Sequence, residues 1–125
     1  MTDTLAIDFG TSNSACAILE NGAVRRIAIE TDGETLPTAV FFPATRGDMR
    51  IGSAAGAALI GGEEGRYMRA LKSVLGTQLL HEPRLIGGKR RTISEIITAF
   101  LETVKARAEA ATGTPLRKAL SGRPV

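Results

Sequence analysis

A carboxylate, a glycine and a run of small polar residues follow one another near the start of the chain, at positions 8–14. Gly10 allows the backbone to approach closely, and the hydroxyl and amide side chains at 11–13 are typical of a tight turn. Successive N–H groups in such a turn, together with hydroxyls, can hold phosphate oxygens. The segment is not a Walker loop, because no Gly-Lys-Ser/Thr sequence follows. An ordinary hairpin, in which Asp8 accepts hydrogen bonds from the turn, is the alternative interpretation.

Asp8 strengthens the phosphate interpretation. We expect this carboxylate at the end of a buried strand, where an unpaired charge costs free energy. A carboxylate at such a position therefore favours a functional role for Asp8. It would supply negative charge to a hydrated Mg²⁺ ion, which prefers few carboxylates and several waters.

Lys72 is the second candidate for chemistry. A helix predicted over residues 66–75 places Lys72 beside Leu71, on the flank of an apolar stripe. There the stem of the side chain can be buried while its ammonium group is presented at an interface. A solvated surface lysine is the alternative interpretation.

The other reactive side chains predict no further site. The basic cluster at 89–91 adjoins a Gly-Gly turn, and we expect a solvated hairpin tip because no aromatic residues interleave with the charges. His81 is the one histidine, so a metal or general-base role is not expected. Cys16 is the one cysteine; it excludes a disulfide framework within the chain and predicts a small buried residue.

Strands are expected in the first forty or so residues and helices mainly after them. The apolar runs predict strands over 4–9, 14–19, 23–29 and 39–42, with a hairpin turn at Asn21-Gly22 and a polar loop over 31–38 that carries Asp32. These strands would form an antiparallel meander.

The second part of the chain predicts a short helix, a long helix and a hairpin. The expected elements are a helix over 54–60 capped by Ser53, a helix over 66–75, a hairpin of 84–86 and 90–93, a helix over 93–112 and a strand over 116–120. Thr92 and Glu95 form a capping box for the long helix, and Gly113 ends it.

Composition indicates a small folded domain. The chain has 125 residues, of which 43% are hydrophobic and 23% charged, and this excludes a disordered chain. A net charge of +3, scattered along the chain, does not favour a nucleic-acid partner. No apolar run reaches the roughly 18 residues of a membrane span. The first residues show no basic or apolar leader pattern, so we expect no leader segment. We therefore expect a cytoplasmic protein with no membrane partner.

The segment at 7–14 resembles the first phosphate loop of the seventy-kilodalton heat-shock chaperones (DnaK type), within the actin and sugar-kinase superfamily. Further segments are similar to that family in the same order: 32–40, the Leu-Lys-Ser-Val-Leu-Gly sequence at 71–76, 88–96, and 121–125 with the Gly-Arg-Pro of the YegD-like branch. The resemblance implies an α/β actin-like (ribonuclease-H-like) ATPase lobe, with a mixed sheet and packed helices. It places the sheet core at 1–38 and 114–125, and a peripheral α/β piece with the long helix at 39–113.

Carried over residue by residue, the resemblance implies ATP or ADP with Mg²⁺ as ligands. Asp8 would orient the water shell of the Mg²⁺ ion, and Lys72 would face the γ-phosphate and position the attacking water. The residues that would wrap the β- and γ-phosphates are Gly10, Thr11, Ser12 and Asn13.

The family's ATPase domain is far longer than this chain and has two lobes. The resemblance therefore implies an N-terminal fragment that is inactive alone and able to self-associate. The intact protein would hydrolyse ATP, with unfolded polypeptide clients or co-chaperones as partners. Two alternatives stay open: the N-lobe of an actin-fold sugar or acid kinase, and a non-catalytic interaction module of the same fold.

Overall fold

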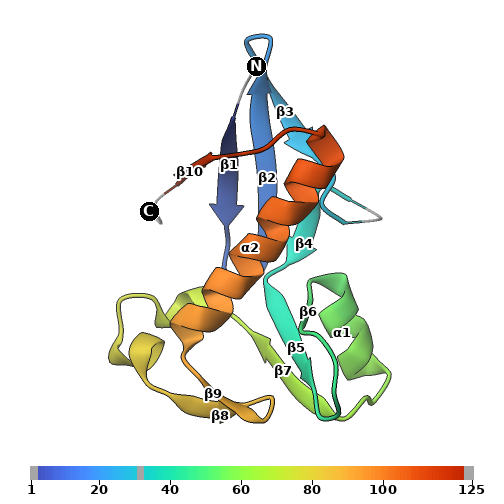
Figure 1. The fold of residues 1–125 in the computed structure, drawn as a ribbon, viewed down its shortest axis with the longest axis vertical. Coiled ribbons are helices and arrows are strands. Elements are labelled where there is room, and N and C mark those ends of the chain that lie inside the picture. Colours follow the sequence, from blue (N-terminus) through green and yellow to red (C-terminus); the bar gives the residue numbers. More distant parts are fainter. Residues whose placement is uncertain (1–2, 31–32, 123–125) are drawn as a thin grey trace.

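A long helix crosses one face of a mixed β-sheet, and a second, smaller sheet with a short helix lies beside it (Figure 1). This arrangement comes from a computed structural model, which describes residues 3–30 and 33–122. Asp32 of the predicted loop and residues 123–125 of the family resemblance lie outside the described residues. The described part of the chain is a small mixed α/β domain, as predicted, and contains no helix both long and apolar enough to cross a membrane.

The main sheet contains β1 (Thr4–Phe9), β2 (Asn13–Glu20), β3 (Ala23–Ile27), β4 (Thr35–Pro37) and β10 (Lys118–Ser121). Its order is β10-β1-β2-β3, and β4 pairs with the start of β2. β1, β2 and β3 form the predicted antiparallel meander, turned at Asn21 and Gly22, whose φ angles of 52° and 77° suit a tight hairpin. β10 runs parallel to β1 and makes the sheet mixed.

The meander does not continue beyond β3. The predicted polar loop contains β4, which hydrogen-bonds to β2 next to β3, whereas the following strand leaves for the second sheet. β4 was missed because three residues ending in a proline carry no periodic hydrophobic signal.

The second sheet has the order β6-β5-β7 and carries α1 on one face. Its elements are β5 (Ala39–Pro43), β6 (Arg50–Ile51), α1 (Ser53–Ile60) and β7 (Gly65–Arg69). Side chains alternate along β5, so that Phe41 packs with the buried alanines of α1 while Val40 and Phe42 pack into the main core. This central strand therefore joins the two halves of the domain.

The helix predicted over 66–75 is wrong. Its first part is β7, and its second part is a 3₁₀ turn, η1 (Leu71–Val74). Tyr67 pairs with Phe41 and packs towards α1, whereas Met68 packs into the main core. The apolar residues that suggest a helical stripe are thus divided between two faces of a strand, because pairing with β5 overrides the local pattern.

Ser53 does not cap α1. Gly52 holds the N-cap position, and the Ser53 amide donates instead to Glu30 Oε1 at 2.9 Å. The φ of Gly52 is 65°, and a Cβ there would collide with the same Glu30 oxygen. A carboxylate distant in sequence therefore replaces the predicted local cap.

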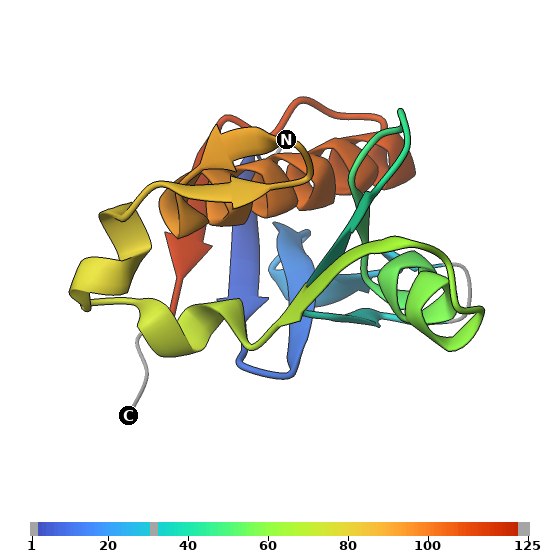
Figure 2. The same cartoon turned by 90° about the horizontal axis from the view of Figure 1, so that it is seen from below.

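The long helix α2 (Ile93–Thr112) is confirmed, together with both of its ends. Thr92 Oγ1 accepts from the Glu95 amide at 3.1 Å, and Gly113 ends the helix with a φ of 69°. The predicted hairpin is also present, as β8 (Arg84–Ile86) and β9 (Lys89–Arg91); a 3₁₀ turn, η2 (Gln78–His81), precedes it. Figure 2 shows α2 lying along one face of the main sheet. Its buried residues are Ile93, Ile96, Ile97, Phe100, Val104 and Ala108.

Candidate functional site

The turn from β1 to β2 has a fixed backbone shape. The Gly10 amide donates to the Asn13 carbonyl at 3.0 Å, and the Thr38 amide donates to the Ser12 carbonyl at 2.9 Å. A Cβ at Gly10 would collide with that Asn13 oxygen, so the turn requires glycine at this position. The Gly10 N–H group is already hydrogen-bonded inside the turn and does not point to a ligand. Gly10 therefore contributes to a ligand site by fixing the shape of the turn.

The side chains of Thr11, Ser12 and Asn13 are exposed on this turn. Within 3–30 and 33–122, none of the three side chains has a hydrogen-bond partner or a charged partner. The turn therefore presents two hydroxyl groups and one amide to solvent from a backbone that is held in place. Such a set can contact the oxygens of a phosphate group.

Sequence reasoning missed a buried hydroxyl pair behind this turn. Ser14 Oγ and Thr38 Oγ1 lie 2.7 Å apart, and the two residues are 2% and 1% exposed. Their hydrogen bond satisfies both groups away from water and ties the start of β2 to the segment between β4 and β5. No local signal could reveal it, because 24 positions separate the two residues.

The expectation that Asp8 is buried is wrong. Leu5 and Ile7 turn towards α2 and the core, so the alternation of the strand places Asp8 on the opposite face, across from Ala15. α2 covers only one face of the sheet (Figure 2), and the Asp8 side chain is exposed. The cost of an unpaired buried carboxylate is therefore no argument for a phosphate site here.

Asp8 lies instead at the rim of an open hollow. The hollow has a volume of about 630 Å³, and its lining includes Ser121 and Gly122 at the end of β10. The hollow lies over the face of the main sheet turned away from α2, and Asp8 marks the end of it where the carboxyl ends of the parallel strands β1 and β10 meet. Ligands of α/β sheets commonly bind at the carboxyl ends of the strands.

Within the described part of the chain, Asp8 is the one carboxylate that lines this hollow. Among the described residues, no three His, Cys, Asp or Glu side chains gather into a group that could hold a metal ion. One exposed carboxylate fits a Mg²⁺ ion that keeps most of its waters, and does not fit a metal held directly by several side chains.

Lys72 lies on η1 rather than on an α-helix. Leu71 is 3% exposed and Val74 packs against the main core, so the turn is anchored, while Lys72 itself is half-buried. Figures 1 and 2 both place η1 at the end of the main sheet where β1 ends. The fold thus brings the element that carries Lys72 to the same end of the molecule as Asp8 and the 10–13 turn.

No protein-family model matches the chain.

Proposed function

We propose that the 10–13 turn, Asp8 and Lys72 form one wall of a site for the phosphate groups of Mg²⁺-ATP, in an actin-like lobe of the heat-shock chaperone type. The observation that carries this proposal is the turn itself. Its backbone is fixed by the Gly10 and Thr38 hydrogen bonds, and its three polar side chains are exposed and unpaired within the described part of the chain.

The sheet topology supports the same proposal. The turn follows the first strand of a mixed sheet, and β10 returns parallel to that strand after the long helix α2. An actin-like lobe of mixed sheet and packed helices is consistent with this order. The resemblance at 7–14 and 71–76 falls on the turn and on η1, at one end of the sheet.

In this proposal each group has a separate role. Thr11, Ser12 and Asn13 contact the β- and γ-phosphates, and Asp8 accepts hydrogen bonds from the waters of a Mg²⁺ ion. Lys72 places a positive charge near the γ-phosphate, where negative charge is redistributed during transfer to water. Catalysis of this kind depends on positioning and charge stabilisation, without a covalent intermediate.

The described residues offer these groups on an open surface. Binding and rate enhancement both rise when a site encloses the phosphates and excludes water. We therefore expect this chain to bind Mg²⁺-ATP with a Kd of about 1 mM, or about −4 kcal/mol, and to show no hydrolysis above background.

An NMR titration of the ¹⁵N-labelled chain with Mg²⁺-ATP tests the proposal. We expect saturable shift changes at Thr11, Ser12 and Asn13, and a Kd weakened by about threefold in Lys72→Ala. Lys105→Ala is the matched control, since it removes the same charge from an exposed position on α2. Unchanged amide signals at 11–13, at ligand concentrations about ten times the expected Kd, would refute the proposal. Equal weakening of Mg²⁺-ATP binding by Lys72→Ala and Lys105→Ala would show a general effect of charge and would exclude a specific contact of Lys72.

A further inference from the structure

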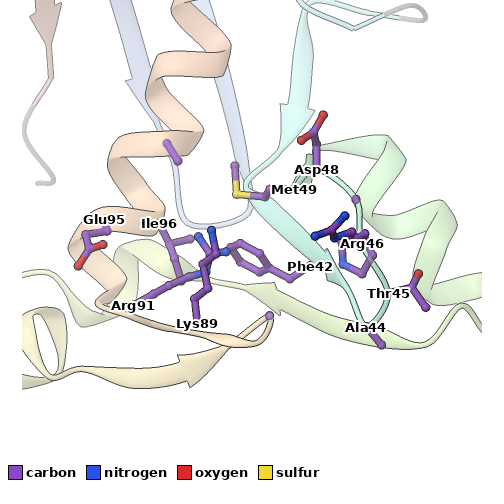
Figure 3. Close-up of a pocket in the computed structure, with 14 residues that line it drawn as sticks. Phe42, Ala44, Thr45, Arg46, Asp48, Met49, Lys89, Arg91, Glu95 and Ile96 are labelled. Carbon is purple, nitrogen blue, oxygen red and sulfur yellow. The ribbon is translucent and has the colours of Figure 1, made fainter.

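A second hollow lies between the β5–β6 loop, the β8–β9 hairpin and the start of α2 (Figure 3). Its volume is about 620 Å³, within the range of sites that hold small molecules. The charged side chains in its lining are Arg46, Lys89, Arg91, Asp48 and Glu95. Three cations and two carboxylates from separate segments of the chain therefore surround one space.

Arg91 is held in a fixed position at this hollow. Its Cζ lies 4.6 Å from the centroid of the Phe42 ring, and its Nε donates to the Ile86 carbonyl at 2.9 Å. The two terminal NH₂ groups have no hydrogen-bond partner in the described part of the chain. A guanidinium group held in this way loses little freedom when both terminal groups bind one oxyanion. The expectation of a solvated hairpin tip is thus wrong for Arg91, though Lys89 and Arg90 are exposed.

The cations at the hollow form no ion pair in the described part of the chain, although Asp48 and Glu95 also line it and leave a net positive charge. Across residues 3–30 and 33–122, no carboxylate lies within 4.0 Å of a nitrogen of Arg46, Lys89 or Arg91. The carboxylate of Glu95 accepts a hydrogen bond from the Thr92 hydroxyl at 3.2 Å, as part of the α2 cap. A concave surface with unpaired cations concentrates anions from solution.

The shape of the pocket depends on the hairpin turn. Gly87 has a φ of 63°, and a Cβ there would lie 2.9 Å from the Cβ of Phe42. The turn of the β8–β9 hairpin therefore packs directly on Phe42, the residue on whose ring Arg91 stacks. This contact holds the Lys89–Arg91 strand against the mouth of the hollow, opposite the loop that carries Arg46.

We propose that this pocket binds a small molecule through a phosphate group, with Arg91 as the bidentate contact and Arg46 and Lys89 as flanking charges. A doubly charged phosphate group has enough oxygens to contact all three cations at once. A single carboxylate has two oxygens, and bidentate pairing with the two terminal NH₂ groups of Arg91 would occupy both of them. The proposal concerns a different part of the molecule from the 10–13 turn and does not depend on the function proposed for that turn.

Pyrophosphate is the probe, titrated into the ¹⁵N-labelled chain at constant ionic strength, with citrate as a polycarboxylate of comparable charge. We expect saturable shift changes at Gly47, Lys89 and Glu95, and a Kd for pyrophosphate at least about tenfold lower than that for citrate. Arg46→Glu and Lys89→Glu should each weaken pyrophosphate binding by about tenfold. Arg90→Glu is the matched control: it makes the same change of charge on the same hairpin, but Arg90 does not line the pocket, so its effect should stay within about twofold.

Arg91→Lys separates geometry from charge, because it keeps the charge and loses the planar fork. We expect this variant to lose the preference for pyrophosphate over citrate. If the variant unfolds, the exposed Arg46→Glu and Lys89→Glu variants still decide the question, with thermal melting as the check on folding.

Three results would overturn the proposal. Equal weakening by Arg90→Glu and Lys89→Glu would mean diffuse attraction to a basic surface. Equal affinity for citrate and pyrophosphate would exclude a phosphate-specific site. Shift changes confined to Thr11, Ser12 and Asn13 would place the anion at the β1–β2 turn, and would leave the function proposed for that turn standing.

Discussion

Burial raises the pKa of the Cys16 thiol. The side chain is 3% exposed within the main core, and burial raises the pKa of its thiol from the ordinary value of 9.0 to about 11. Between these two values the unfolded chain loses the thiol proton while the folded chain keeps it. The folded state is therefore favoured below about pH 9, and this contribution is lost as the pH rises towards about 11.

We predict that the free energy of unfolding falls more steeply over this pH interval in the native sequence than in Cys16→Ala, by about 1–3 kcal/mol in total. Urea unfolding at a series of pH values measures the difference. The alanine variant also loses the packing of the buried thiol, so the slopes are compared and not the absolute values. Parallel curves for the two proteins would contradict a buried, protonated thiol.

Gly10 is the residue on which the shape of the β1–β2 turn depends most directly. In Gly10→Ala the new Cβ would collide with the Asn13 carbonyl oxygen, and a backbone atom cannot move aside as a flexible side chain can. We predict a loss of about 1–3 kcal/mol in the free energy of unfolding, measured by urea denaturation. Gly56→Ala is the control, because a Cβ there meets no atom within 4 Å and lies inside α1; it should stabilise the chain by about 0.5–1 kcal/mol.

At the scale of the elements, α2 stabilises the main sheet through one large side chain. Phe100 is 0% exposed, and its ring centroid lies 5.9 Å from that of Phe9 on β1. We predict that Phe100→Ala leaves a cavity and lowers the free energy of unfolding by about 3–5 kcal/mol. Glu102→Ala, an exposed change on the same helix, should stay within about 0.5 kcal/mol. A Phe100→Ala variant that melts close to the native protein would contradict this packing.

Elements whose signals lie within a few neighbouring residues could be predicted. Both ends of α2 and its core face are determined by residues inside or beside the helix, as in the Thr92 cap and Gly113. β7 could not be predicted, because Tyr67 and Met68 fit a helical stripe equally well until β5 is present to pair with them.

The candidate site also contains some features that could be predicted from the sequence and others that could not. The 10–13 turn could be predicted from its glycine and small polar residues, as could the strands on either side of it. The exposure of Asp8 could not, because it depends on which face of the sheet α2 covers. The Ser14–Thr38 pair and the stacking of Arg91 on Phe42 both depend on contacts distant in sequence.

At the scale of the whole molecule, Glu30 connects three parts of the fold. Its carboxylate accepts from the Ser53 amide at the start of α1 and lies 3.8 Å from Arg107 on α2, which also donates to the Ile29 carbonyl. The Glu30 side chain is only 14% exposed, so the pair is shielded from solvent far more than a surface ion pair.

We predict that Glu30→Gln lowers the free energy of unfolding by about 1–2 kcal/mol, because Arg107 loses its counter-charge and α1 loses a negative charge at its N-terminus. Glu34→Gln is the matched control. It breaks an ion pair with Arg26 at the same 3.8 Å, but both side chains are more than half exposed, and the effect should be within about 0.5 kcal/mol. Equal losses in the two variants would show that Glu30 has no connecting role.

The face of the main sheet turned away from α2 is left open in the described fold. The strand register brings Leu120 beside Ala6 and Ala6 beside Ala17, and Val24 borders the same hollow. Val24 is 75% exposed and Leu120 is 67% exposed. Exposed apolar side chains of this kind promote association between copies, although Arg26 and Asp8 line the same hollow. β3 and β10 lie at the edges of the sheet, where each can add a further strand.

We therefore predict oligomers that grow with concentration, measured by light scattering on a sizing column. The double variant Val24→Lys and Leu120→Lys should restore the monomer, because two charges on this face would have to be buried when copies associate. Ile60→Lys changes a residue that is 88% exposed on α1, away from this face, and should leave the association unchanged. A monomer at every concentration, or a monomer restored equally by Ile60→Lys, would mean that this sheet face does not bring copies together.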